Sequence, residues 1–260
     1  MSTRAEPVLW RWAAYGALLG LVGALVLFAP ARWLAAGVRS ASNGRVVLAE
    51  PRGTVWDGSA QLIVTGGAGS NDAAALPGRL QWRLRAAGLG ANIQLAAECC
   101  TPQPIALAMH WRLRGASLQV ADGLSQWPAS LLAGLGTPCN TLQPEGELHL
   151  STRALSIEWA EGRLAVSGGA ELVAQRMSSR LSTLRPMGSY RITLQGGPTP
   201  ALRLDTLDGA LRLAGSGQWV GGRLRFGGEA SAAPEREAAL SNLLNIIGRR
   251  NGARSIISIG

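Results

Sequence analysis

The sequence predicts a mainly β protein, in which a single N-terminal transmembrane helix precedes a largely antiparallel, curved β-sheet domain with one or two short helices. Three observations support this prediction: an uncharged apolar run near the N-terminus, alternating apolar and polar residues after residue 45, and 34 glycines among 260 residues. Only 16 % of the residues are charged, whereas 47 % are hydrophobic. This balance favours a packed core and short strands with many turns over long charged helices.

The N-terminal apolar run covers residues 12–31, WAAYGALLGLVGALVLFAPA. About 20 helical residues rise about 30 Å, the thickness of a hydrocarbon core. Trp10, Trp12 and Tyr15 at one end and Trp33 at the other suit the membrane interfaces. We therefore expect an anchor at residues 11–33, with residues 1–10 in the cytoplasm and residues 34–260 forming the β-rich domain. The flanking arginines are nearly balanced and support this orientation only weakly.

A cleaved signal peptide is the alternative interpretation of this run, because residues 29–31 (APA) resemble a cleavage site. We disfavour it, since the run is long and Pro30 and Arg32 flank that site badly. A buried helix of a soluble domain does not suit an unbroken apolar run of this length.

Alternating runs after residue 45 predict strands with one buried and one solvated face. They cover residues 79–85, 110–114, 147–153, 155–159, 163–166, 170–174, 190–195, 201–204, 209–213, 217–219 and 223–226. Glycine-bearing breaks between them supply turns, among them Gly168-Gly169 and Gly215. Since no helix-length run separates most of these strands, we expect antiparallel pairing.

Two helical segments interrupt the predicted strands. Residues 127–135 (WPASLLAGL) carry an early proline and apolar residues that can cover one end of a sheet. Residues 234–248 place Leu240, Leu243, Leu244 and Ile247 on one helical face and acidic residues in the first turn. The closing residues 255–260 (SIISIG) predict a last strand.

The sequence offers no catalytic, cofactor-binding or metal-binding motif. His110 and His149 are the only histidines, and they are far apart in the chain. The glycine-rich segment 65–71 has no lysine and opens no helix, so it does not predict a phosphate loop. Carboxylates are sparse and unpaired within apolar clusters. We therefore expect a protein that is not an enzyme, without cofactor or metal.

Three cysteines, Cys99, Cys100 and Cys139, lie beside proline-containing loops. In an oxidising compartment, one of the vicinal pair can bond Cys139 and stabilise the fold by about 2–4 kcal/mol. Three unbonded buried thiols are the alternative, and metal ligation by three thiols without a nearby histidine is a weaker one.

The net charge is +9, and every basic residue is arginine. Between residues 176 and 225 eight arginines face two aspartates in the sequence, which predicts a locally basic surface that includes Arg212, Arg223 and Arg225. These three side chains either contact a partner or a membrane surface, or merely keep the protein soluble. The membrane segment argues against a nucleic-acid partner.

An ordered set of segments resembles the type II secretion system protein N family (general secretion pathway protein N). These segments are GTVWDGSAQL (53–62), LPGRLQWRL (76–84), PCNTLQPEGELHL (138–150), MGSYRITL (187–194), LDTLDGALRLAGSGQW (204–219) and LLNIIGRRNGA (243–253). No single segment is specific, but their order covers nearly the whole chain. The vicinal cysteines are no part of this resemblance.

The resemblance implies a non-catalytic component of the machine that exports folded proteins across the outer membrane. Such a component is anchored in the inner membrane with its bulk in the periplasm, and its partners are the outer-membrane secretin and inner-membrane platform proteins. We expect contacts through sheet edges, by strand addition, or through the arginine-bearing faces.

In this light the first segment predicts a structural turn, in which Gly53 and Gly58 permit unusual backbone angles, Trp56 packs, and Asp57 hydrogen-bonds its own backbone. A ligand-binding role for Trp56 and Asp57 is the alternative.

Two other functional classes stay open at this point. A lipid-binding or lipid-transfer module would use an apolar groove in a curved sheet. A glycan hydrolase would need two facing carboxylates, for which the candidates are Asp57, Asp122, Glu145 and Glu147.

Overall fold

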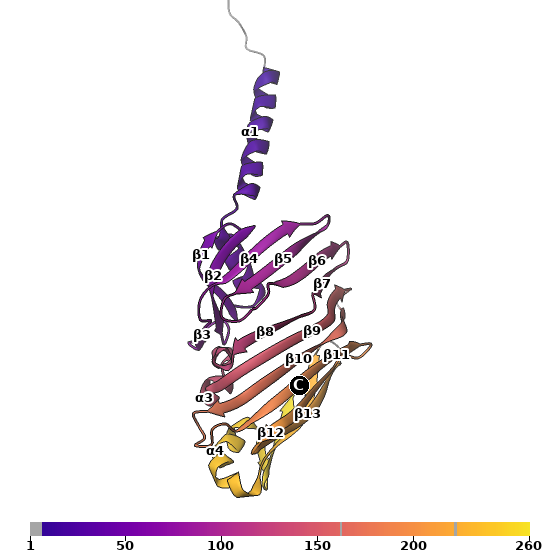
Figure 1. Ribbon diagram of the computed structural model, residues 1–260. Coiled ribbons are helices and arrows are strands. Elements are labelled where there is room, and N and C mark those ends of the chain that lie inside the picture. Colours follow the sequence, from indigo (N-terminus) through magenta and orange to yellow (C-terminus); the bar gives the residue numbers. More distant parts are fainter. Residues whose placement is uncertain (1–6, 162, 221–222) are drawn as a thin grey trace, which may run out of the picture.

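The computed structural model describes residues 7–161, 163–220 and 223–260. Residues 1–6, which belong to the expected cytoplasmic segment, lie outside this range. The described chain consists of an N-terminal helix and a β body (Figure 1). The fold is mainly β and antiparallel, as the alternating pattern predicts.

The helices are α1 (Pro7–Leu27), α2 (Ala31–Ala41), the 3-10 helix η1 (Ala129–Leu135), α3 (Cys139–Leu142), the 3-10 helix η2 (Pro234–Arg236) and α4 (Glu237–Ile247). The strands are β1 (Val46–Gly53), β2 (Asp57–Thr65), β3 (Ala73–Ala75), β4 (Leu80–Ala86), β5 (Gly90–Ala97), β6 (Ile105–Arg112), β7 (Gly115–Val120), β8 (Gly123–Pro128), β9 (Pro144–Ala160), β10 (Arg163–Ser179), β11 (Gly188–Gly197), β12 (Ala201–Gly209), β13 (Leu211–Val220), β14 (Arg223–Ala232), β15 (Arg249–Asn251) and β16 (Arg254–Ile259).

The expected anchor at residues 11–33 is not one continuous helix. Helix α1 ends at Leu27, and α2 begins after Pro30, its extended N-cap residue; proline disfavours helical geometry at the residue before it, so α1 does not continue into α2. Ala31 is buried, and Leu34 and Val38 of α2 pack against the sheet, so residues 31–33 belong to the β body. In the part of the chain that the structure describes, no helix meets the length and apolarity of a membrane span.

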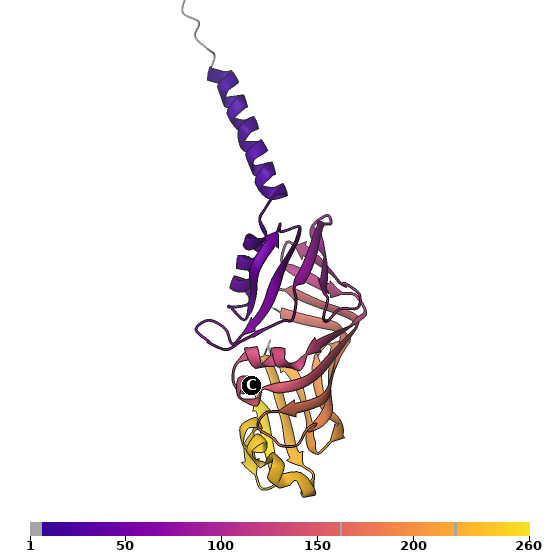
Figure 2. The same ribbon diagram turned by 60° about the vertical axis from the view of Figure 1, so that its left-hand side comes forward.

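The sixteen strands form one antiparallel sheet that curves along its length (Figure 2). Its main order is β1-β2-β4-β5-β6-β7-β9-β10-β11-β12-β13-β14-β16-β15, with β3 beside β2 and β8 beside β9. The long strand β9 pairs with β8 through its first half and with β7 through its second half. Most strands that follow one another in the sequence are therefore paired in the sheet.

One face of this sheet is apolar from end to end, because cross-strand partners point to the same side. Two cores lie on that face. Near β1–β4 the first core contains Leu48, Ala60, Trp82 and residues of α2 and η1. The second core lies near β9–β16 and contains Leu148, Tyr190 and the buried leucines of α4.

Several predicted strand boundaries are wrong, because a β-bulge or a glycine interrupts the alternation without ending the strand. The runs 147–153 and 155–159 are one strand, β9, in which Ala154 adopts φ 47°. Gly168-Gly169 lies at a bulge within β10, and Gly215 lies inside β13, so neither forms the expected turn. A bulge adds one residue and shifts the alternation without ending the strand.

The two predicted helical segments fare differently. Residues 127–135 begin as the end of β8 and continue as η1, so no α-helix forms there. The segment 234–248 becomes η2 followed by α4, with Leu240, Leu243 and Leu244 buried as its periodicity predicts. The predicted last strand is β16.

Candidate functional site

The hairpin corner at residues 53–58 joins β1 to β2 and lies beside the C-terminal end of α1. The Thr54 N–H donates to the carbonyl of Asp57 at 2.8 Å, which closes a four-residue turn. Gly53 has φ 84°, a conformation that side chains disfavour. A Cβ on Gly58 would lie 2.6 Å from both the Arg52 carbonyl and the Trp82 ring, so this position has no room for a side chain.

Two hydrogen bonds and an isolated antiparallel β-bridge connect this corner to the chain just before the β body. The Trp56 indole N–H donates to the Val26 carbonyl at 2.8 Å, in the last turn of α1. The Val55 N–H donates to the Ala29 carbonyl at 2.8 Å, and Pro30 bridges Thr54. The last carbonyls of a helix lack intrahelical donors, so Trp56 satisfies one such acceptor. We call this set of contacts the joint.

Trp82 of β4 supports the joint from the core. Its side chain is 3 % exposed, and its indole N–H reaches the carbonyls of Thr54 at 3.2 Å and Val55 at 3.1 Å. The turn is therefore fixed to the sheet on one side and to the end of α1 on the other.

Asp57 does not hydrogen-bond its own backbone, contrary to the prediction. Instead, the Asp57 N–H donates a hydrogen bond to the Thr54 hydroxyl at 3.1 Å. The Asp57 carboxylate pairs with the Arg83 Nε at 3.1 Å, and both side chains are more than half exposed. At that exposure the pair contributes little stability.

A polar cleft of about 630 Å³ opens beside the corner on the opposite, polar face of the sheet. Arg52, Asp57, Arg79, Arg83 and Glu98 are among its lining residues. Arg79 is held in place, because its guanidinium donates to the Glu50 carbonyl at 2.6 Å and the Ser59 hydroxyl at 3.2 Å. This cleft is not apparent from the sequence, because its residues come from β1, β2, β4, β5 and the loops beside β4 and β5.

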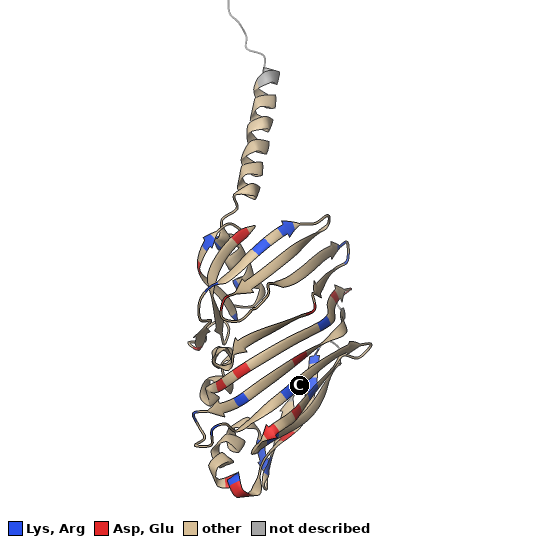
Figure 3. Cartoon of the chain, viewed as in Figure 1, with Lys and Arg blue, Asp and Glu red and all other residues tan. Residues whose placement is uncertain are grey.

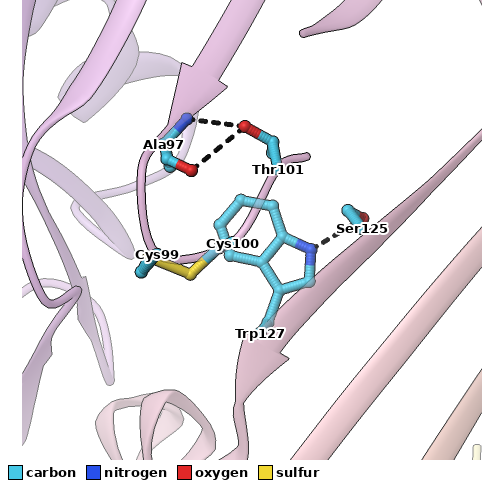
Figure 4. Close-up of a disulfide and its surroundings, with 6 residues drawn as sticks. All are labelled: Ala97, Cys99, Cys100, Thr101, Ser125 and Trp127. Atoms are coloured by element: carbon cyan, nitrogen blue, oxygen red, sulfur yellow. Dashed lines mark hydrogen bonds between the residues drawn. A yellow bond between two sulfur atoms is a disulfide. The ribbon is translucent and has the colours of Figure 1, made fainter. Parts of the chain in front are cut away.

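The disulfide differs from the predicted pairing with Cys139. Cys99 and Cys100 bond to each other in the turn between β5 and β6 (Figure 4), whereas Cys139 carries a free thiol. Cys100 is buried in the first core, and its carbonyl accepts from the Gln126 N–H of β8 at 2.7 Å. Burial raises the pKa of the Cys139 thiol.

The side chains around the disulfide fix this turn. The Thr101 hydroxyl contacts both the N–H of Ala97 at 2.8 Å and its carbonyl at 3.1 Å. Trp127 packs against the same core and donates its indole N–H to the Ser125 hydroxyl at 2.9 Å (Figure 4). The hydrogen bond from Gln126 to Cys100 thus links the β5–β6 turn to β8. At this place β9 changes its partner strand from β8 to β7.

The structure does not bring Arg212, Arg223 and Arg225 together. All three lie on the polar face, but Arg225 is opposite Gln218, six residues from Arg212 along β13. That separation is about 20 Å along a strand. Arg223 and Arg225 are neighbours at the start of β14, whereas Arg212 lies at the other end of the hairpin.

Strand pairing also brings acidic residues to the region that looked basic in the sequence. Arg191 lies 3.4 Å from Glu171 on the adjacent strand, and Arg176 lies 2.7 Å from Glu147. Figure 3 shows both signs of charge interspersed along these strands. Part of the arginine charge in this stretch is therefore paired with carboxylates of neighbouring strands.

The carboxylates proposed for a hydrolase bind other partners. Asp122 accepts a backbone hydrogen bond from Ala154, Glu145 lies 3.1 Å from Arg185, and Glu147 contacts Arg176. Within the described residues no group of three or more His, Cys, Asp or Glu side chains is arranged to hold a metal ion.

These observations define a class of protein: a single amphipathic antiparallel sheet, closed at its N-terminal end by a joint to a helix, with arginine-paired carboxylates. The family model described as "Type II secretion system (T2SS), protein N" matches residues 44–257. The chain belongs to this family, as the ordered segments predict. Neither the curated proteins nor the solved structures contain a significant match.

Proposed function

We propose that this chain is a non-catalytic, inner-membrane-anchored component of the type II secretion system that assists export of folded proteins through protein–protein contacts. Membership in the protein N family carries the secretion role and the envelope setting. The anchoring, the mechanism and the partners form the proposal.

The uncovered surface of α1 supports the proposed anchor. Leu18, Leu19, Val22, Leu25 and Leu27 are each about half or more exposed. Exposed apolar side chains in such number need a covering environment, and a bilayer supplies one. In this proposal α1 lies in the inner membrane and the β body lies in the periplasm, where a disulfide such as Cys99–Cys100 persists.

The joint suits a component that transmits position from the membrane to a rigid body. Because Trp56 and Val55 hydrogen-bond to Val26 and Ala29, the sheet does not hang from a free linker. A partner bound to the β body would therefore be held at a fixed position relative to the end of α1.

The structure favours faces over edges as partner surfaces. The edge strand β1 carries Glu50 at φ 47° followed by Pro51, and the edge strand β15 has three residues, of which two are arginines. A bulge, a proline and edge charges all hinder strand addition. The polar cleft beside the joint is the contact surface that we propose for the secretin or a platform protein.

In-cell photocrosslinking tests this function. A photoreactive amino acid replaces Gln81 in the cleft, and the matched control replaces Ser258, an exposed polar-face residue of β16. We expect the Gln81 position to capture the secretin or an inner-membrane platform protein, and the Ser258 position to capture neither. Equal capture from both positions, or none from Gln81 in cells that secrete normally, would contradict the proposed surface.

A further inference from the structure

A row of apolar side chains crosses the sheet near the tips of its hairpins. Trp111 of β6 is opposite Ala116 of β7, Ala116 is opposite Trp159 of β9, and Trp159 is opposite Leu164 of β10. Leu89 precedes β5, and its carbonyl accepts a hydrogen bond from the backbone N–H of Trp111 at 2.8 Å. We call Leu89, Trp111, Trp159 and Leu164 the tip row.

The tip row lies on the same face of the sheet as the two cores, yet nothing in the described chain covers it. A second row runs parallel to it through Met109, Leu118, Ile157 and Val166. Tip-row side chains are 84 % (Leu89), 50 % (Trp111), 42 % (Trp159) and 37 % (Leu164) exposed. The helices that cover this face elsewhere, α2 and α4, pack over other strands.

We propose that the tip row binds an acyl chain of a phospholipid. The row crosses five adjacent strands, β5, β6, β7, β9 and β10, and so spans about 19 Å at about 4.8 Å per strand spacing. Half of a hydrocarbon core of about 30 Å is about 15 Å, the depth that one acyl chain occupies. The row is therefore long enough to cover one chain along most of its length.

The backbone in this region favours an acyl chain over a peptide. Each of the five strands is flanked on both sides, so a partner strand finds no free edge. An extended peptide lying on the apolar face would leave its own backbone groups without partners, whereas an acyl chain has no polar groups to satisfy. The indoles of Trp56, Trp82 and Trp127 donate to protein acceptors, but those of Trp111 and Trp159 find none among the described residues.

The position of the row agrees with a phospholipid. Arg85 and Arg112, near the ends of β4 and β6, are exposed, but the strand register places both on the opposite, polar face, so they do not flank the row. The β4–β5 hairpin, where the row begins, lies toward α1, and the later strands lie progressively farther from it (Figures 1 and 2).

This proposal goes beyond the secretion role and can fail or hold without it, because lipid binding needs no other component. The test places a photoreactive amino acid at Trp111 or, as a matched control, at Glu158. Glu158 is the exposed neighbour of Trp159 on the opposite face of β9. The full-length protein is reconstituted into vesicles of phosphatidylethanolamine and phosphatidylglycerol, irradiated, and measured by intact-mass spectrometry.

We expect an added phospholipid mass from position 111 and none from position 158. The substitutions Trp159→Gln and Leu164→Gln together reduce that adduct about tenfold, because each removes apolar contact. The control Ile256→Gln, on the polar face and 43 % exposed, leaves the adduct unchanged.

Four results would overturn the proposal: no lipid adduct, equal adducts from positions 111 and 158, a covalent dimer of this chain, or capture of another protein by position 111 in cells. The dimer would assign the row to a second copy, and the captured protein would assign it to a protein partner. The crosslinks from Gln81 described above would still decide the secretion role separately.

Discussion

Trp82→Phe is the substitution that tests the joint most quantitatively. It removes the one N–H that serves two turn carbonyls and part of a ring that is 3 % exposed. Unsatisfied carbonyls cost about 1–3 kcal/mol, and the lost apolar area adds about 1 kcal/mol. Because the turn is partly solvated, we expect the free energy of unfolding to fall by about 2–3 kcal/mol.

The assay is urea unfolding of the full chain in detergent micelles, followed by the β-sheet signal in far-ultraviolet circular dichroism. Trp111→Phe is the matched control, since this half-exposed indole has no acceptor within the described residues, and it should cost less than about 0.5 kcal/mol. The urea dependence should keep its slope while the midpoint shifts. Equal losses for the two variants would refute the reasoning that Trp82 holds the corner.

The other predictions concern single buried groups. Burial raises the pKa of Tyr190, so the phenol stays protonated in the native protein at a pH near 10, where it ionises in the unfolded chain. The free energy of unfolding should therefore fall as pH rises above about 10. In pH-dependent unfolding, Tyr190→Phe should remove that decrease. The same variant loses the hydroxyl that donates to the Leu211 carbonyl, which costs about 1 kcal/mol at neutral pH. Alkylation of the denatured protein should add one label, at Cys139, without reductant and three labels after reduction; two or three labels without reductant would contradict the vicinal disulfide. Ser255→Ala should cost about 1–2 kcal/mol because Ser255 is fully buried and donates to a carbonyl of α4 at 2.6 Å, whereas the exposed Ser258→Ala should be neutral in thermal unfolding.

The sequence predicts this fold as far as local pattern reaches. Alternation identifies most of β4, β9–β14 and β16, and the leucine spacing identifies α4. It fails where alanines leave no contrast between faces, as in β3, where the apolar residue is exposed and the polar one buried, as for Leu124 and Ser125 of β8, and where a bulge shifts the phase, as at Ala154. The sheet order follows almost directly from the chain order, because nearly every strand pairs with its neighbour in sequence.

The candidate site is harder to predict because its contacts join distant residues. The turn at residues 53–58 was foreseen from its glycines, but the hydrogen bond from Trp56 to Val26 links positions 30 residues apart. The vicinal disulfide follows from the geometry of one turn, which cysteine spacing does not encode. The break after Leu27 depends on the packing of α2 against the first core, so hydropathy alone predicts one continuous helix across it.

The proposed function requires a β body outside the cytoplasm that is held at the membrane by α1. Thr183→Cys, in an exposed turn, provides a single labelling site when Cys139 is replaced by serine. In spheroplasts with an intact inner membrane, a membrane-impermeant maleimide should label Thr183→Cys fully, and the labelled protein should remain in the membrane fraction after alkaline extraction. Labelling that requires lysis of the inner membrane would place the body in the cytoplasm and contradict the proposed function.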